Sequence, residues 1–286
     1  MTHAFWDWWQ HLPRSIDPNL FTIGSFQLRY YGLMYIVAFG LTYALLVYRS
    51  RKDGFDGYTP ERIQDLMVWF IAGTILGGRL GYVLFYDLSY FAANPLKIVL
   101  PFDWSDGFRF TGISGMSYHG GVIGVVTAGY LFSRRRQQPF VTMVDLVAPA
   151  APLGYTFGRL GNFINGELYG RATTVPWGMY FPLDPTGQLR HPSQLYEAFF
   201  EGIFLFLLLW SVRNHPRCRG GLLGLYLMGY GAVRFGLEFF RAPDPHLMFV
   251  LGPLTMGQVL CAVMVLIGIG AFAIGRRAAR TGAGSK

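Results

Sequence analysis

Three arginines lie inside apolar segments of the chain: Arg79, Arg159 and Arg234. A charged group at membrane depth is costly and usually faces the protein interior, a water-filled cavity or a ligand. Guanidinium groups bind phosphate through paired, charge-assisted hydrogen bonds. The three arginines therefore favour a site for an anion, which at membrane depth is most simply a phospholipid headgroup. Three unrelated structural arginines are the alternative interpretation.

The densest group of polar residues surrounds the second of these arginines. Arg159, Asn162 and Gly166 recur at i, i+3 and i+7, which places them on one face of a helix. Three further candidates for the same ligand site are Asn165, Glu167 and Gly170. A structural polar cluster that joins neighbouring helices is the alternative, but the density of amides, charges and glycines favours a ligand site.

A second polar stripe lies further along the chain, on one helix face. Its members at i, i+4, i+8 and i+11 are Tyr230, Arg234, Glu238 and Arg241. We expect Glu238 to orient one of its arginine neighbours rather than to act as a base. An Arg–Glu pair that simply neutralises itself is the alternative for this residue.

Two histidines lie near the predicted ends of helices. His119 is flanked by glycines, which permit close approach of another backbone or of a ligand. A neutral imidazole accepts a proton near neutral pH, so His119 is a candidate base, with a structural histidine as the alternative. For His191, which precedes Pro192, we expect packing and capping at the entry of a helix.

The composition is typical of a membrane protein. Of 286 residues, 52% are hydrophobic and only 14% are charged, whereas about a quarter of the residues in soluble domains are charged. The formal charge of +8 is spread in short clusters between apolar runs, which argues against nucleic acid as a partner. Cys218 and Cys261 are far apart and lack metal-ligand spacing, so neither a disulfide framework nor a metal site is indicated.

Seven apolar segments, each near the ~20 residues that cross the hydrocarbon, predict an all-α integral membrane protein. We expect a single domain over residues 1–286, built as a seven-transmembrane-helix bundle. The predicted helices are 29–48, 64–86, 116–133, 143–163, 194–212, 221–240 and 254–275. Prolines and glycines interrupt the fourth segment, and broken helices are tolerated in membranes where they line cavities.

The N-terminal segment 1–27 lacks the pattern of a cleavable signal. Phe5, Trp8, Trp9 and Leu12 recur at helical spacing, which predicts an amphipathic helix lying at the membrane interface. A disordered tail is the alternative.

Lysines and arginines gather after the first, third, fifth and seventh segments, which the positive-inside rule places in the cytoplasm. The N-terminus is then outside and the C-terminus inside. Loops 87–115, 164–193 and 241–253 face outward, and the first two form a small head over the bundle.

The stretch Gly158–Gly170, with the sequence GRLGNFINGELYG, resembles the signature of bacterial prolipoprotein diacylglyceryl transferases. Five other blocks resemble the family's remaining motifs, in the same order along the chain: Arg29–Tyr35, Gly77–Tyr82, Gly115–Gly121, His191–Glu197 and Gly229–Arg234. The resemblance spans most of the chain and is weakest at residues 87–112 and 172–190.

Members of that family move the diacylglyceryl group of phosphatidylglycerol to the lipobox cysteine thiol of a prolipoprotein signal peptide, forming a thioether and releasing glycerol 1-phosphate. The resemblance implies this reaction without a cofactor, in the bacterial cytoplasmic membrane with the active site towards the outer leaflet. It implies catalytic roles for His119, Arg159, Arg234 and Tyr31, with His119 as the candidate base. Residue pattern and resemblance together give the expected phosphatidylglycerol ligands: Arg159, Asn162, Asn165, Gly166, Glu167, Gly170, Arg79, Tyr230, Glu238 and Arg241.

Two other functional classes fit single features of the chain. The sequence Gly112–Gly115 matches the GxSG pattern of intramembrane serine proteases, but His119 follows Ser114 too closely to come from a different helix. An anion or lipid transporter would favour inverted repeats, whereas the three helices that carry the arginines run in the same direction.

Overall fold

The computed structural model describes residues 2–23, 26–55, 57–100, 102–103, 109–110, 115–242, 252 and 254–283. The described chain is mostly helical, with two short antiparallel sheets of two strands each. It divides into two compact units, residues 1–54 with 144–286 and residues 55–143. That the chain forms a single domain stays a prediction.

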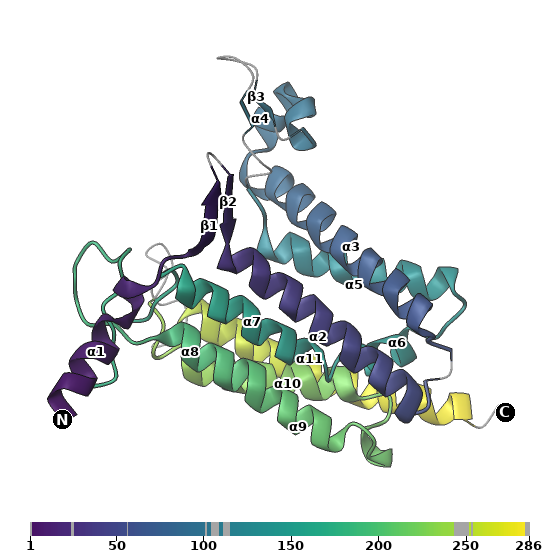
Figure 1. Cartoon of the computed structure of the whole chain (residues 1–286). Coiled ribbons are helices and arrows are strands. Elements are labelled where there is room, and N and C mark those ends of the chain that lie inside the picture. The colour runs from purple at the N-terminus through teal and green to yellow at the C-terminus, as the bar shows by residue number, and fades with distance from the viewer. Residues whose placement is uncertain are drawn as a thin grey trace. The chain divides into compact units, whose positions relative to one another are not determined.

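The first unit contains most of the helices (Figure 1). Its elements are α1 (Thr2–Ser15), β1 (Asn19–Ile23), β2 (Phe26–Arg29), α2 (Tyr30–Lys52), α7 (Ala151–Ile164), α8 (Ser193–Glu197), the π-helical turn η2 (Ala198–Phe204), α9 (Leu205–Val212), η3 (Pro216–Cys218), α10 (Leu222–Leu237) and α11 (Met256–Ala283). The second unit contains α3 (Pro60–Tyr86), α4 (Leu88–Ala93), η1 (Pro95–Ile98), β3 (Phe102–Asp103), β4 (Arg109–Phe110) and α5 (Tyr118–Arg135). Helix α6 (Phe140–Val147) begins in the second unit and ends in the first.

Four of the described helices are long and apolar enough to cross a membrane: Tyr30–Lys52, Pro60–Tyr86, Ser193–Val212 and Met256–Ala279. A fifth span is present if α6 and α7, which meet at 51°, count as one broken span. Pro149 and Pro152 lie at this break, as the prolines of the fourth predicted segment suggested. All seven predicted segments contain helix, so a mostly helical membrane protein is confirmed, while seven crossings stay a prediction.

Glycines bring helices of the second unit into direct contact. Gly73, Gly77 and Gly81 recur every four residues along α3 and face Gly120 and Gly124 of α5. A Cβ at Gly120 or Gly124 would collide with a carbonyl oxygen of α3. Small residues at four-residue spacing allow such close helix packing in membranes. One glycine beside His119 therefore serves the approach of another backbone.

In the first unit, α7 packs against both α2 and the π turn η2, and α10 packs along α11 (Figure 1). Glycines again mark the closest approaches. A Cβ at Gly231 of α10 would lie 2.9 Å from the carbonyl oxygen of Cys261 in α11. A side chain at Gly202 of η2 would collide with Thr156 of α7. These contacts fix α10 beside α11 and η2 beside α7.

A compact region of loop, which we name the loop cap (residues 165–192), follows α7. Phe163, Met179 and Phe181 form its buried core, and Trp9, Leu12, Ile16, Tyr169 and Leu195 pack around them. The predicted N-terminal helix forms as α1, and its Trp9 donates a hydrogen bond to the Trp177 carbonyl at 3.0 Å. Phe5 and Trp8 remain exposed. The outward direction of the cap and the interfacial position of α1 stay predictions.

Candidate active site

Helix α7 presents three polar residues on one face, at i, i+4 and i+7: Tyr155, Arg159 and Asn162. Arg159 Nε donates to the Tyr155 hydroxyl at 2.7 Å, and Arg159 Nη1 donates to Asn162 Oδ1 at 3.3 Å. The guanidinium also lies 4.9 Å from the centre of the Tyr155 ring. Arg159 is thus held in one orientation by its own helix.

Three arginines contact Glu197, the last residue of α8. Its Oε2 lies 2.9 Å from Arg159 Nε and 3.5 Å from Arg234 Nη1. Its Oε1 accepts a hydrogen bond from Arg241 Nη1 at 2.9 Å. The Glu197 side chain is 1% exposed, whereas those of Arg159, Arg234 and Arg241 are 17%, 16% and 23% exposed. The carboxylate is therefore more deeply buried than the side chains of its three arginine partners.

A second buried carboxylate, Glu201, comes from the π turn that follows α8. Tyr155 donates a hydrogen bond to Glu201 Oε2, and Arg234 Nη1 lies 3.5 Å from Glu201 Oε1. Single π-helical turns are rare and often occur at functional sites. Here the π turn carries one acid and directly follows the other, Glu197, so that both carboxylates meet residues of α7 and α10.

Glu238, near the end of α10, is the third carboxylate of the cluster. Its Oε2 lies 3.3 Å from Arg234 Nη2 and 3.5 Å from Arg241 Nε. Its Oε1 accepts from Thr255 Oγ1 at 3.3 Å and lies over Gly257, in the first turn of α11. A helix N-terminus carries partial positive charge, which favours a carboxylate there. Glu238 is placed to orient both of its arginines.

The end of α7 forms a connected group of amides. Glu167 Oε1 accepts hydrogen bonds from Asn162 Nδ2 at 2.8 Å and from Asn165 Nδ2 at 3.3 Å. Asn162 links this group to Arg159. The ring of Tyr31 packs against Gly161, where an added Cβ would lie 2.8 Å from the ring. The structure thus brings Tyr31 next to the α7 residues.

Within the described residues, several buried polar atoms of this cluster have no hydrogen-bond partner in the protein. They are Asn165 Oδ1, Glu201 Oε1, Arg234 Nη1, Glu238 Oε2 and Arg241 Nε. Buried polar groups are normally paired, so a concentration of unpaired atoms needs an explanation. Four of these atoms are ion-paired with one another at 3.5 Å, Glu201 Oε1 with Arg234 Nη1 and Glu238 Oε2 with Arg241 Nε, without forming a hydrogen bond. Their hydrogen-bonding capacity is therefore incompletely used, which suits a site that binds an anion.

Comparison with known proteins places the chain in a family. Residues 18–274 match the model of the family described as prolipoprotein diacylglyceryl transferase. A phosphatidylglycerol–prolipoprotein diacylglyceryl transferase of Chlorobaculum tepidum is 54% identical over 93% of this chain and 92% of its own length. Proteins of the same name from Idiomarina loihiensis and Coxiella burnetii are 47% and 48% identical, covering 92% and 88% of this chain and 94% and 93% of their own lengths.

The chain belongs to the prolipoprotein diacylglyceryl transferase family.

Among the residues predicted for the transferase site, those of the first unit lie together. Tyr31, Arg159, Asn162, Asn165, Glu167, Arg234, Glu238 and Arg241 form the connected group just described, and Tyr230 lies edge-on to Tyr155 at 5.9 Å. Their roles in the transferase reaction stay predictions.

Two glycines of the transferase signature have structural reasons to be glycine. Gly166 has φ +69°, a left-handed conformation that favours glycine, and a Cβ there would lie 2.8 Å from Pro182. A Cβ at Gly170 would collide with the carbonyl oxygen of Phe240. Contact of either glycine with a phospholipid stays a prediction.

Arg79 and His119 lie in the second unit, so their approach to Arg159 also stays a prediction. Arg79 donates to the carbonyl oxygens of Ile98 at 2.8 Å and Lys97 at 2.5 Å. These bonds hold the segment after α3. His119 is exposed in the first turn of α5. Ser114 of the protease alternative lies outside the described residues.

His191 packs among aromatic rings, as expected at the entry of α8. Its ring lies 5.2 Å from that of Phe240, and its Nδ1 is 3.2 Å from the Tyr196 hydroxyl. Burial lowers the pKa of His191. The histidine is therefore biased towards its neutral form, which suits a packing role.

Sequence reasoning missed Tyr155, Glu197 and Glu201. Glu197 was considered only as the last residue of the block His191–Glu197, without a role of its own, although it lies four residues before Glu201 in an otherwise apolar segment. Two acids at i and i+4 inside a membrane span are as costly as the arginines. That cost was the signal available in the sequence.

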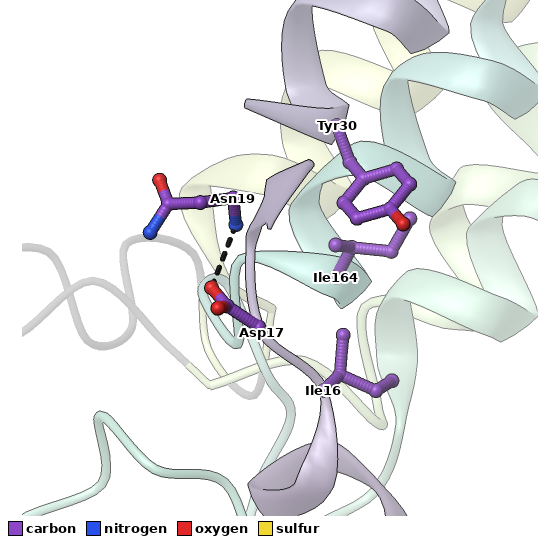
Figure 2. A pocket seen from close by; sticks show the side chains of 5 residues that line it. All are labelled: Ile16, Asp17, Asn19, Tyr30 and Ile164. Atoms are coloured by element: carbon purple, nitrogen blue, oxygen red, sulfur yellow. Dashed lines mark hydrogen bonds between the residues drawn. The ribbon is translucent and has the colours of Figure 1, made fainter. Parts of the chain in front are cut away.

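A pocket of about 310 Å³ opens beside the end of α7, lined by Ile16, Asp17, Asn19, Tyr30 and Ile164 (Figure 2). None of these five residues is basic, so the pocket does not suit a phosphate. Among the described residues, no group of three or more His, Cys, Asp and Glu side chains could hold a metal ion. That the transferase needs no metal or cofactor stays an expectation.

Proposed function

We propose that this chain transfers the diacylglyceryl group of phosphatidylglycerol to a cysteine thiol of a prolipoprotein, forming a thioether and releasing glycerol 1-phosphate. The proposal rests on one observation: the partly exposed side chains of Arg159 and Arg234 both form ion pairs with the buried Glu197, beside the family signature. Relatives named for this reaction share about half of their residues with the chain over most of its length.

The arginines suit the charge that develops during this transfer. The cysteine sulfur forms a bond to the terminal glycerol carbon of the lipid, and the bond from that carbon to the phosphate oxygen breaks. The electron pair leaves with oxygen, so a phosphodiester with one negative charge becomes a monoester that gains more. Guanidinium groups fixed around the departing phosphate stabilise the transition state more than the bound substrate.

The thiol must also lose its proton, because a free cysteine has a pKa of about 8.5 and the thiolate is the nucleophile. His119 is the proposed base. Its exposure at the start of α5 supports this role, because a cysteine on a separate substrate must be able to reach it. The field of the arginines is the alternative means of activating the thiol.

The transfer is tested with purified protein, phosphatidylglycerol vesicles and a synthetic peptide that contains a lipobox cysteine. We expect a diacylglyceryl peptide by mass spectrometry and an equal amount of glycerol 1-phosphate. Phosphatidylcholine vesicles and a Cys→Ser peptide are the controls. Absence of a thioether with active-site residues intact would contradict the proposed function.

The role of His119 is tested with His119→Gln, which should retain phosphatidylglycerol binding while transfer slows by roughly 10²–10⁴-fold, the range for loss of a general base. Raising the pH should partly restore the rate, because solvent then supplies thiolate, and the rescue should fade above the pKa of the peptide thiol. Parallel pH profiles for both proteins, or loss of lipid binding, would assign His119 to structure and leave activation to the arginines.

We further propose that the chain crosses the bacterial inner membrane seven times, with its N-terminus and loop cap outside and its C-terminus in the cytoplasm. The clusters of Lys and Arg between apolar segments support this orientation. In a background of Cys218→Ser and Cys261→Ala, Gln188→Cys should react with an impermeant thiol reagent in intact cells, and Ser285→Cys should not. The reverse labelling would refute the orientation.

A further inference from the structure

Glu197 occupies the centre of the arginine cluster without a role in the reaction just described. We infer that Glu197 is a positioning residue that holds the guanidinium groups of Arg159, Arg234 and Arg241 at one point and balances their charge so that the phosphate product can leave. This inference rests on the proposed function and deepens it. Glu197 acts through the arginines and does not touch the substrate.

The geometry supports positioning. The two oxygens of Glu197 contact Arg159 and Arg241 at 2.9 Å each, and Arg234 at 3.5 Å. Arg159 lies in the middle of α7, Arg234 is in α10, and Arg241 follows α10. One fully buried carboxylate therefore ties together residues that α7 and the end of α10 bring from separate parts of the sequence.

The side chains of the cluster differ in their exposure to solvent. The Glu197 side chain is 1% exposed and the three arginine side chains are 16–23% exposed, so an anion can reach the arginines more readily than it can reach the carboxylate. Each arginine can then keep its contact with Glu197 while it contacts a phosphate. A shift of about 1 Å in a group that contacts the reacting atoms can slow a reaction roughly 10²-fold.

The charges of the cluster also balance. Three arginines are ion-paired with three carboxylates: Arg159, Arg234 and Arg241 with Glu197, Glu201 and Glu238. The product of the transfer carries more negative charge than the substrate. In a partly buried site, surplus positive charge would bind the product more tightly than the substrate, because charges interact more strongly there than in water. Glu197 prevents that surplus.

The test is Glu197→Gln, which keeps the size and one acceptor but removes the charge. We expect kcat to fall by roughly 10²-fold because the arginines lose their common anchor. The KM for phosphatidylglycerol should stay within about threefold or fall, and glycerol 1-phosphate should inhibit at roughly tenfold lower concentration, because the cluster gains net positive charge. Asp184→Asn, which removes another buried carboxylate paired with an arginine, is the matched control and should keep all three constants.

Glu197→Asp provides a second test because it keeps the charge but shortens the side chain. Its kcat should fall, while inhibition by glycerol 1-phosphate stays as in the wild type. Three results would overturn the inference: wild-type kcat in either variant, a raised KM with lowered thermal stability in both, or failure of both to fold when Asp184→Asn folds. No thioether from the wild-type protein would instead refute the proposed function, so the two failures are distinguishable.

Discussion

The first unit contains two buried groups of arginines and carboxylates near opposite ends of α2. The first surrounds Glu197 and is the proposed active site, which we name the active-site cluster; Tyr31 approaches it from the start of α2. The second, which we name the clamp, is Arg49, Asp53, Asp145 and Arg213, at the end of α2. At about 1.5 Å per helical residue, the length from Tyr31 to Arg49 is ~27 Å. The two groups have similar chemistry but are bonded differently.

In the clamp, arginines and carboxylates bind main-chain groups as well as each other. Arg49 is fully buried and donates to the carbonyl oxygens of Asp145 and Leu146 and to Asp53 Oδ2, the last at 2.9 Å. Asp53 Oδ2 also accepts from Arg213 at 3.1 Å. Asp145 accepts from the backbone N–H groups of Gly220 and Leu222. The clamp thus joins the end of α2, helix α6 and the turn before α10.

The difference lies in how completely the polar atoms are paired. Within the described residues, no side-chain atom of Arg49, Asp53, Asp145 or Arg213 is both buried and without a hydrogen-bond partner. The active-site cluster contains such atoms in Arg234, Arg241, Glu201 and Glu238. Burial and charge are common to both groups, so incomplete hydrogen bonding is the property that distinguishes the proposed ligand site from the clamp.

The largest expected effect follows from conservative changes of one arginine in each group. Arg159→Lys keeps the charge but loses the planar fork that binds two phosphate oxygens, so turnover should fall by about 10²–10³-fold, as for loss of a preorganised donor. Arg213→Lys in the clamp is the matched control and should stay within about threefold of wild type. Turnover is measured on membranes with equal protein levels. Equal losses of turnover in both variants would contradict the distinction between the active-site cluster and the clamp.

The next effect concerns stability. Arg49→Met removes a buried donor to two carbonyl oxygens and leaves Asp53 with Arg213 as its remaining arginine partner. Breaking a buried pair by removing one partner costs ~3–5 kcal/mol. We expect a clearly lower Tm in detergent, with near-normal turnover per folded molecule. Arg51→Met removes an exposed arginine of the same helix and should leave Tm almost unchanged. Loss of turnover without loss of stability in Arg49→Met would give the clamp a role in the reaction.

The smallest effect concerns the loop cap, which contains a separate, fully paired carboxylate. Burial alone would raise the pKa of Asp184, but hydrogen bonds from Arg190 and Thr186 outweigh it and lower the pKa to about 2. Because the folded pKa lies below the unfolded value of ~3.9, this stabilisation is present above pH 4 and is lost as the pH falls towards 2.

Asp184→Asn should therefore lower Tm at pH 7, and the difference from wild type should shrink as the pH falls towards 2, where wild-type Asp184 becomes protonated. Tm measured between pH 7 and pH 2 provides the test, with Asp87→Asn, an exposed residue of the second unit, as the control. A difference between wild type and Asp184→Asn that persists undiminished at pH 2 would mean that the Asp184 charge is not the cause.

The helices could be predicted from the sequence because apolar length and composition are local properties. The broken fourth segment could be predicted for the same reason, since Pro149 and Pro152 stand at the bend between α6 and α7. The glycines beside His119 indicated a close approach, but not that Gly120 meets Gly77. Partners across helices depend on packing, which helical spacing along one segment does not specify.

The same limit applies to the site. Helical spacing placed Arg159 with Asn162, and Arg234 with Glu238, because each pair belongs to one helix. It could not identify Glu197 as the shared partner, because the contact requires α7, α8 and the end of α10 to pack together. The arginines indicated an anion, which the sequence predicted to be the lipid phosphate, with Glu238 as an orienting partner on the same helix. The structure adds buried carboxylates of the protein itself.

The most direct test of the central claim is a structure determined with phosphatidylglycerol and without an acceptor thiol, so that no transfer occurs. We predict that the phosphate lies within hydrogen-bond distance of Arg159 and Arg234, on the side away from Glu197, and that the clamp is unchanged. A phosphate bound elsewhere, with both arginines still paired only to carboxylates of the protein, would contradict the assignment of this cluster as the lipid site.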